Sequence, residues 1–312
     1  MGAIAKVPWI WMDGKFIEWD NARVHVTAHC LHYGTGVFEG IRCYETPRGP
    51  AVFKLDAHLK RLINSASIYD LAIPFSPADL HRATLELIGR NGLTSAYIRP
   101  IAFFGAYSLD VWPRGCPVNV AIAAWPRGEY LGKEALELGV RVMISSTRRF
   151  HESVIPTGGK SCGQYVNSVL AVQEAFRGGY DEAILLNQQG QVAEGSGENL
   201  FIVKGGTLVT NDAGASILMG ITRETVIEIA GDLDLPVSIR PLDVADILSA
   251  DEVFFTGTAV EVTPIREVDD RVIGSGRRGS VTERIQSTFF DAVHGKIERY
   301  QGWLSYVAPA GD

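Results

Sequence analysis

The sequence has few cysteines, and none of them is spaced for metal binding or redox exchange. Its 312 residues include only Cys30, Cys43, Cys116 and Cys162. No two of these have the CxxC spacing that is typical of zinc sites and of redox motifs. We therefore expect neither a disulfide framework nor a metal site, but the reduced thiols of a cytoplasmic protein.

Two further features are missing. No apolar run reaches the roughly 20 residues that a membrane-spanning helix needs, and the chain does not open on a basic segment followed by an apolar one. The formal net charge of -7 argues against a nucleic-acid-binding surface. The sequence thus predicts a cytoplasmic protein that acts on small molecules, without membrane or nucleic-acid partners.

The sequence has enough hydrophobic residues to form two cores, since 46% of its residues are hydrophobic and 21% are charged. The expected strands occur in clusters, and so do the expected helices, which predicts a mixed α/β (α+β) fold. The pattern breaks after residue 124. We expect a small domain over 1–124, a connecting loop over 125–136 and a larger domain over 137–312.

The periodicity of apolar residues predicts most of the elements. Asp13-Gly14 between two short apolar runs predicts a hairpin over 9–19. The other strands are expected at 24–26, 37–44, 95–104, 118–124, 140–146, 183–186, 200–203, 207–210 and 252–256. The helices are expected near 59–66 and at 77–91, 165–177, 222–230 and 280–293.

Lys160 and Glu194 are the first pair of candidate site residues. Lys160 follows Gly158-Gly159, and Glu194 begins the glycine-containing segment 194–201. A pyridoxal phosphate enzyme needs an amine for the cofactor's aldehyde and an acid for its ring nitrogen. Either residue alone is more often a solvated loop residue. Glu198 is an alternative to Glu194, which we prefer because it comes directly after a predicted strand.

Two small-residue turns are suited to binding an anion. Gly220-Ile221-Thr222 precedes a predicted helix, and helix N-termini bind phosphate through free N–H groups and the helix dipole. The alternative is that Thr222 simply caps the helix. The segment 256–259 follows an apolar strand and offers hydroxyl and N–H donors. Arg61 lies off the apolar stripe of its helix, so its position alone predicts a solvated face.

Three other residues have two readings each. Tyr97 and Arg99 point to the same side of a strand and could clamp a carboxylate. Alternatively, Pro100 marks an edge strand with a surface arginine. Tyr165 opens a helix and either contacts the cofactor or packs against the core.

The segment 274–279 matches the GxGxxG pattern of dinucleotide sites. It lacks a surrounding βαβ unit and contains two arginines. A capping box from Ser280 to Glu283 explains this region better.

Taken together, these motifs resemble the branched-chain amino acid aminotransferases, which are fold type IV pyridoxal phosphate enzymes with a D-amino acid aminotransferase-like fold. The resemblance covers nearly the whole chain. Its most specific pieces are the segments 31–42, 96–100, 194–201 and 220–223, with Lys160 between them. It implies two domains with the cofactor between them and at least a homodimer, because part of each site comes from a neighbouring subunit.

The resemblance also implies roles for individual residues. Lys160 would bind pyridoxal 5'-phosphate covalently and move the proton at the substrate Cα, with Glu194 at the ring nitrogen and Tyr165 at the phenolic oxygen. The phosphate would be bound by Arg61, Ile221, Thr222 and Thr258. The substrate would be bound by Tyr33, Phe38, Gly40, Tyr97, Arg99, Tyr130, Thr258 and Ala259.

The implied reaction is amino transfer from leucine, isoleucine or valine to 2-oxoglutarate, giving branched-chain 2-oxo acids and L-glutamate. Alternatives of the same fold are a D-amino acid transaminase, an (R)-amine transaminase and an aminodeoxychorismate lyase. A non-enzymatic pyridoxal phosphate carrier is disfavoured, because a carrier has no need to tune the ring. Arg127 departs from relatives that carry a bulky aromatic there, which puts the apolar character of the pocket in doubt.

Overall fold

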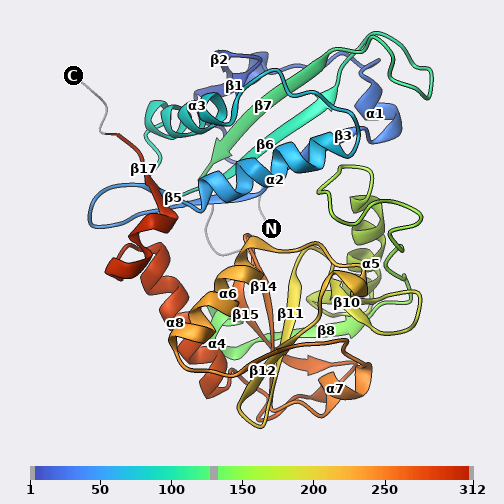
Figure 1. Ribbon diagram of the computed structural model, residues 1–312, viewed down its shortest axis with the longest axis vertical. Coiled ribbons are helices and arrows are strands. Elements are labelled where there is room, and N and C mark those ends of the chain that lie inside the picture. The colour runs from blue at the N-terminus through green and yellow to red at the C-terminus, as the bar shows by residue number, and fades with distance from the viewer. Residues whose placement is uncertain (1–3, 127–132, 309–312) are drawn as a thin grey trace. The chain divides into compact units, whose positions relative to one another are not determined.

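The computed structural model describes residues 4–126 and 133–308. These residues form two compact units (Figure 1). The first contains 4–126, 159–164 and 291–308, and the second contains 133–158 and 165–290. Lys160 thus belongs to a short segment that packs with the N-terminal part of the chain. No helix among the described residues is long and apolar enough to cross a membrane.

The first unit is built on an eight-stranded sheet in which the paired strands are antiparallel. The order is β17-β5-β4-β6-β7-β1-β2, and β3 pairs with β6. The predicted hairpin is present, with Asp13 and Gly14 at φ values of 48° and 85° in its turn. The strands are β1 (Trp9–Met12), β2 (Lys15–Glu18), β3 (Gly36–Phe38), β4 (Ile41–Tyr44), β5 (Ala51–Phe53), β6 (Ala96–Phe104), β7 (Val118–Trp125) and β17 (Leu304–Tyr306).

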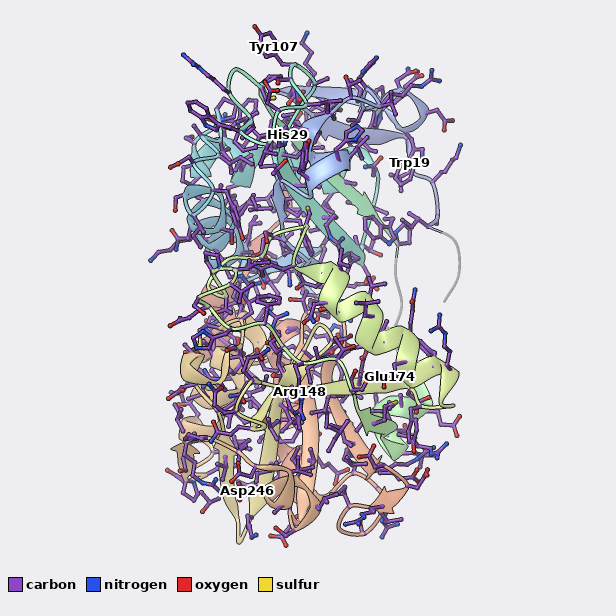
Figure 2. All side chains as sticks on the ribbon, turned by 90° about the vertical axis from the view of Figure 1, so that its right-hand side faces the viewer. Trp19, His29, Tyr107, Arg148, Glu174 and Asp246 are labelled. Atoms are coloured by element: carbon purple, nitrogen blue, oxygen red, sulfur yellow. The ribbon has the colours of Figure 1, made fainter. Side chains whose placement is uncertain are left out.

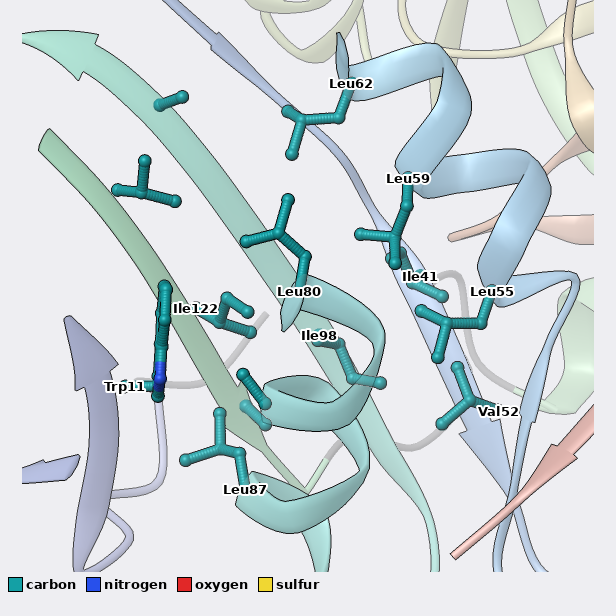
Figure 3. Packing of buried hydrophobic residues seen from close by; sticks show 14 of the residues in the cluster. Trp11, Ile41, Val52, Leu55, Leu59, Leu62, Leu80, Leu87, Ile98 and Ile122 are labelled. Atoms are coloured by element: carbon teal, nitrogen blue, oxygen red, sulfur yellow. The ribbon is translucent and has the colours of Figure 1, made fainter. Parts of the chain in front are cut away.

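Helices α2 (Leu55–Ser67) and α3 (Pro77–Arg90) pack against this sheet and against each other. Leucines of both helices meet Ile98 of β6 and Ile122 of β7 in one buried cluster (Figure 3). Each fully buried leucine stabilises the fold by about 1.5–3 kcal/mol. Helix α3 begins with a capping box between Ser76 and Asp79, so its predicted start is confirmed. The core therefore fixes α2, which carries Arg61.

The predicted strand 37–44 is wrong in one respect, because it breaks into β3 and β4 at Glu39-Gly40. The break lies opposite Pro100 of β6, which has no N–H to offer a neighbouring strand. The Glu39 N–H still donates to the Pro100 carbonyl, at 2.9 Å. A Cβ on Gly40 would lie 2.1 Å from the Tyr97 hydroxyl, so only glycine fits there.

The predicted strand at 24–26 is also wrong. These residues form no strand and lead into the short helix α1 (His29–Tyr33). His32 Nε2 contacts the Val26 carbonyl at 2.9 Å, which holds the segment against the helix. The apolar side chains that indicated a strand remain exposed, with Val26 at 71%.

The second unit is built on a nine-stranded mixed sheet in the order β10-β9-β8-β15-β14-β11-β12-β13, with β16 paired to β15. Neighbours β15–β8, β8–β9 and β12–β13 are parallel. The strands are β8 (Val140–Ile144), β9 (Glu182–Leu186), β10 (Val192–Gly195), β11 (Asn199–Lys204), β12 (Thr207–Thr210), β13 (Val237–Ile239), β14 (Glu252–Gly257), β15 (Glu261–Val268) and β16 (Arg271–Val272).

The second unit also carries α4 (Lys133–Leu138), α5 (Tyr165–Arg177), α6 (Ile221–Asp232), α7 (Val244–Leu248) and most of α8 (Ser280–Val293). Single turns of 3₁₀ helix complete the chain at Trp19–Asn21 and Ala213–Ala215, with a longer one at Glu298–Trp303. Helix α5 has the predicted bounds, and Glu174 projects from it (Figure 2).

The start of α8 differs from the sequence expectation. The N–H groups of Val281 and Thr282 donate to the carboxylate of Glu252, at 3.0 and 2.7 Å. The Glu283 carboxylate accepts from Arg278 instead of closing a capping box, and the Glu283 N–H bonds to the Gly279 carbonyl. The predicted box from Ser280 to Glu283 is therefore wrong, because a glutamate from β14 caps the helix.

Candidate active site

The backbone of Lys160 is held on both sides within the first unit. Its N–H donates to the Ser65 hydroxyl of α2 at 3.0 Å, and its carbonyl accepts from the Phe38 N–H at 3.0 Å. Val37 and Ser161 form a β-bridge beside it. A Cβ on Gly159 would lie 3.0 Å from Ile68, so this glycine permits close packing on α2. The lysine therefore sits on a fixed backbone.

Three of the predicted substrate-binding residues are linked by successive contacts to the Lys160 side chain. Its Nζ is 5.3 Å from the centre of the Phe38 ring, and the Arg99 guanidinium is 4.8 Å from the same ring. Arg99 Nη2 donates to the Tyr97 hydroxyl at 3.2 Å. One apolar ring thus lies close to both an amine and a guanidinium.

The edge-strand interpretation of Tyr97 and Arg99 is wrong. Strand β6 is internal, paired with β4 and β3 on one side and with β7 on the other. Arg99 Nε is buried and has no hydrogen-bond partner among residues 4–126 and 133–308. A buried guanidinium nitrogen without a partner is costly, so this cation is suited to binding an anion.

Arg61 does not lie on a solvated face. Its side chain is 15% exposed, and its Nε and Nη2 donate to the two oxygens of Glu39 at 2.6 and 2.9 Å. His58 Nδ1 contacts the same carboxylate at 2.8 Å. Burial opposes ionisation of Glu39, but the Arg61 guanidinium and the hydrogen bonds from His58 and Arg61 outweigh it and hold its pKa far below the usual range.

Among residues 4–126 and 133–308, no hydrogen bond joins Tyr33 to Lys160, Phe38, Tyr97 or Arg99. Tyr33 lies on α1, and its hydroxyl donates to the Leu109 carbonyl at 2.7 Å. Its side chain is well exposed. Gly40 lies against the Tyr97 hydroxyl, as described above.

Glu194 ends up buried in the second unit, on β10. Its Oε1 is 2.9 Å from Nη2 of Arg149, and its Oε2 accepts from the Leu218 N–H and the Asn199 amide at 3.1 and 3.2 Å. Three contacts, with Arg149, Leu218 and Asn199, thus fix the position of the Glu194 carboxylate.

Glu198, the alternative, is equally buried but has different surroundings. Both glutamates are 6% exposed. The Glu198 Oε2 accepts from the Gly197 N–H at 2.9 Å, and its backbone carbonyl accepts from the Gly195 N–H. These two bonds lie within the turn 195–198, whereas the Glu194 carboxylate contacts Arg149, Leu218 and Asn199.

The two segments that are predicted to bind an anion both lie in the second unit. Gly220 is the N-cap of α6, no side chain caps the helix, and Ile221 and Thr222 are its first two residues. The plain N-cap reading of Thr222 is therefore wrong. A Cβ on Gly220 would lie 2.0 Å from the Asn199 amide oxygen. Thr258 and Ala259 lie in the turn between β14 and β15.

Three residues singled out by the sequence remain to be placed: Tyr165, Tyr130 and Arg127. Tyr165 is the first residue of α5. Tyr130 lies outside the described residues, as does Arg127.

Comparisons with known proteins place these two units in a family. The family model of amino-transferase class IV matches residues 36–268. The chain belongs to the class IV aminotransferases. Within this family it is 48% identical to a branched-chain-amino-acid aminotransferase of Pseudomonas aeruginosa, covering 96% of this chain and 97% of the relative. It is 46% identical to one of Escherichia coli, covering 97% and 98%.

Solved aminotransferase structures agree. The Escherichia coli branched-chain amino acid aminotransferase superposes with a TM-score of 0.95 at 46% identity, covering 97% of this chain and all of the other. The T.th. branched-chain amino acid aminotransferase with pyridoxamine 5'-phosphate superposes with a TM-score of 0.94 at 48% identity, covering 97% and 99%. The expected family, enzyme class and fold type IV architecture are confirmed.

Sequence reasoning missed the partners of the candidate residues in this aminotransferase. Arg149 and Asn199 hold Glu194, Glu39 holds Arg61, and His58 contacts Glu39. None of these pairs has a fixed sequence spacing, because each joins different elements. Glu39 lies within the segment 31–42 that carried the resemblance, but no periodicity distinguished it.

Proposed function

We propose that this aminotransferase transfers the amino group of leucine, isoleucine or valine to 2-oxoglutarate and gives the branched-chain 2-oxo acid and L-glutamate. The observation that carries the proposal is that the Phe38 ring lies close to both the Lys160 amine and the Arg99 guanidinium. The ring offers an apolar surface to a branched side chain, and the guanidinium offers a partner to a second carboxylate. One site can thus serve both halves of the reaction.

The proposed cofactor is pyridoxal 5'-phosphate, which would draw electrons away from the bond to the substrate Cα. The donor set fits it. Lys160 supplies an amine on a rigid backbone, Glu194 a carboxylate paired to Arg149, and α6 an N-terminus without a side-chain cap. The T.th. relatives were solved with pyridoxamine 5'-phosphate and with a phosphopyridoxyl-glutamate compound, which supports this assignment.

Each residue then has a proposed task. Lys160 binds the cofactor and moves the proton at the substrate Cα. Glu194 keeps the ring nitrogen protonated, and Tyr165 donates to the phenolic oxygen. The phosphate-binding residues are Arg61, Ile221, Thr222 and Thr258. The substrate-binding residues are Tyr33, Phe38, Gly40, Tyr97, Arg99, Tyr130, Thr258 and Ala259.

The proposed assembly is at least a homodimer with a shared site. An exposed apolar patch supports it, formed by Val26, Leu31, Tyr107, Val111 and Trp112, which are 63–80% exposed. The loop 105–116 is joined to α1 by the Tyr33–Leu109 hydrogen bond and by His29 Nε2 on the Asp110 carbonyl. Figure 2 shows Tyr107 at the outer end of this loop. Patches of this kind mark interfaces.

All four cysteines are free, which fits the proposed cytoplasmic location.

A donor panel tests the function. Purified enzyme is given leucine, isoleucine, valine, D-alanine or an (R)-amine, with and without 2-oxoglutarate. We expect turnover with the three branched-chain donors only when 2-oxoglutarate is present. Preference for D-alanine or the amine would favour the alternative transaminases, and release of pyruvate from aminodeoxychorismate without an acceptor would favour the lyase.

Lys160→Ala supplies the site-specific test. We expect it to lose the visible absorbance of the lysine-bound cofactor and nearly all turnover. Lys60→Ala, at an exposed position of α2, should keep both. Ordinary activity in Lys160→Ala would contradict the assignment.

A further inference from the structure

Glu39 is the most deeply buried acid of the first unit, and the proposed chemistry gives it no task. It is fully buried, as is His58 beside it. Its carboxylate accepts four hydrogen bonds, from Arg61 Nε and Nη2, from His58 Nδ1, and from the Gly40 N–H at 3.3 Å. Burying an ion pair costs desolvation free energy, so such a pair is weak evidence for a purely stabilising role.

The hydrogen bonds of Glu39 restrict Arg61 in position and in angle. The carboxylate holds the Nε–Nη2 edge of the guanidinium through two parallel bonds, which fixes its plane. His58 fixes the carboxylate in turn. Burial is the main cause that lowers the pKa of His58, and the Glu39 carboxylate only partly offsets it. A neutral imidazole that donates from Nδ1 is consistent with that direction.

The same residues connect Arg61 to Lys160 by a closed ring of hydrogen bonds. The Arg61 carbonyl accepts from the Ser65 hydroxyl at 2.8 Å, and that hydroxyl accepts from the Lys160 N–H at 3.0 Å. The Lys160 carbonyl accepts from the Phe38 N–H, one residue before Glu39. The Glu39 carboxylate then closes the ring on Arg61. Every member lies in the first unit.

We propose that Glu39, held in place by His58, is a positioning residue for Arg61. It sets the Arg61 guanidinium at a fixed place relative to Lys160, so that the cofactor's phosphate and its aldehyde are bound at the same time. This inference rests on the proposed function, in which Arg61 binds the phosphate and Lys160 the aldehyde. A guanidinium free to change rotamer would lose conformational entropy each time it bound the phosphate.

The test compares pyridoxal 5'-phosphate with pyridoxal, which lacks the phosphate. Cofactor is removed from the purified enzyme, and the dissociation constant of each compound is measured from the visible absorbance. In Glu39→Gln we expect the constant for pyridoxal 5'-phosphate to rise roughly tenfold, as for partial loss of a charge-assisted hydrogen bond. The constant for pyridoxal should change less than about twofold. Glu86→Gln, which removes the same charge from an exposed pair with Arg90, should change neither.

Three outcomes would overturn the inference. Equal weakening of both compounds would mean that Glu39 is only structural. Tighter binding of the phosphate compound would mean that Glu39 merely competes with phosphate for Arg61. No change would mean that Arg61 is positioned without it.

Further variants separate this inference from the proposed function. Arg61→Ala should lose the preference for the phosphate compound; if it does not, the assigned role of Arg61 fails, and this inference with it. If Arg61→Ala loses the preference and Glu39→Gln keeps it, only this inference fails. In the Arg61→Ala background, Glu39→Gln should have no additional effect on the preference, because the two residues act as a unit.

Glu39→Gln leaves a buried cation without its partner and could fail to fold. His58→Leu then takes its place, since it removes the brace and keeps the ion pair. We expect it to weaken pyridoxal 5'-phosphate selectively by a few-fold. An unchanged preference in folded His58→Leu would contradict the bracing role. Glu39→Gln with Arg61→Met removes both charges and should regain thermal stability without regaining the phosphate preference.

Discussion

At the scale of single residues, the choice between Glu194 and Glu198 depends on partners rather than on burial. Both are equally buried, but Glu194 is paired with the Arg149 guanidinium, whereas the Glu198 carboxylate accepts from the Gly197 N–H in its own turn. A carboxylate can hold a proton on a ring nitrogen through its charge, and a neutral amide at that position would have no charge with which to do so. The surroundings of Glu194 thus favour the role that its sequence position predicted.

We therefore expect Glu194→Gln to keep the fold and to lower kcat about a hundredfold or more, because electrostatic stabilisation of this kind contributes roughly 3–4 kcal/mol. Glu198→Gln should cost much less. Single-turnover rates with leucine, measured beside circular dichroism as a folding control, decide this. A slow Glu198→Gln beside a normal Glu194→Gln would reverse the assignment.

The site residues that could be identified from the sequence are those whose neighbours in the sequence indicate their role. Lys160 and Glu194 stand in glycine-containing segments, and Ile221 and Thr222 stand at the start of a helix. Arg61 was assigned to solvent because helical periodicity reports only the stripe that faces the core. Its true neighbour, Glu39, lies 22 residues away and meets it only after β3, β4 and α2 have packed.

At the scale of elements, helices with local signals were predicted well. Helices α3 and α5 have apolar stripes and glycines just beyond their ends, so the predicted 77–91 and 165–177 agree with the observed 77–90 and 165–177. The missed features depend on contacts across the fold. Glu252 caps α8 from β14, and Pro100 on β6 divides the predicted strand 37–44. No local pattern contains such information.

Strand β9 contains a titratable group whose effect on stability can be predicted. Glu182 is buried at its start, and its Oε1 accepts from the Ala183 N–H at 2.7 Å. Burial raises the pKa of Glu182 from 4.5 to about 6, although hydrogen bonds from Ala183 and Ser196 oppose the rise. The folded state thus binds the proton more tightly than the unfolded state, so this contribution to stability is present below pH 4.5 and is lost as the pH rises through 6.

Glu182→Gln cannot titrate and should lack this loss. We expect the free energy of unfolding of the variant, relative to wild type, to rise by about 2 kcal/mol between about pH 4 and pH 7, which corresponds to a pKa difference of about 1.5. Urea unfolding at several pH values measures the difference. A constant offset over the whole range would mean that the carboxylate is not perturbed in the folded protein.

At the scale of the whole molecule, the predicted site residues are divided between the two units. Lys160, Arg61, Phe38, Tyr97 and Arg99 belong to the first, whereas Glu194, Ile221, Thr222 and Thr258 belong to the second. Tyr33 lies on α1, and its hydroxyl donates to the Leu109 carbonyl in the loop that also carries the exposed Tyr107, Val111 and Trp112. If Tyr33 serves a neighbouring subunit, as the proposed shared site requires, association and activity should be lost together.

Val111→Lys combined with Trp112→Lys tests this, because both side chains are highly exposed in the single chain and two added charges would oppose burial in an interface. Wild type should sediment at twice the chain mass or more, and the variant as a folded monomer that keeps the visible cofactor absorbance but has lost most of its turnover. Val272→Lys, at a similarly exposed apolar position on β16 of the second unit, should keep both assembly and activity. A wild-type monomer with full activity, or an active monomeric variant, would show that each chain completes its own site and that the patch serves another purpose.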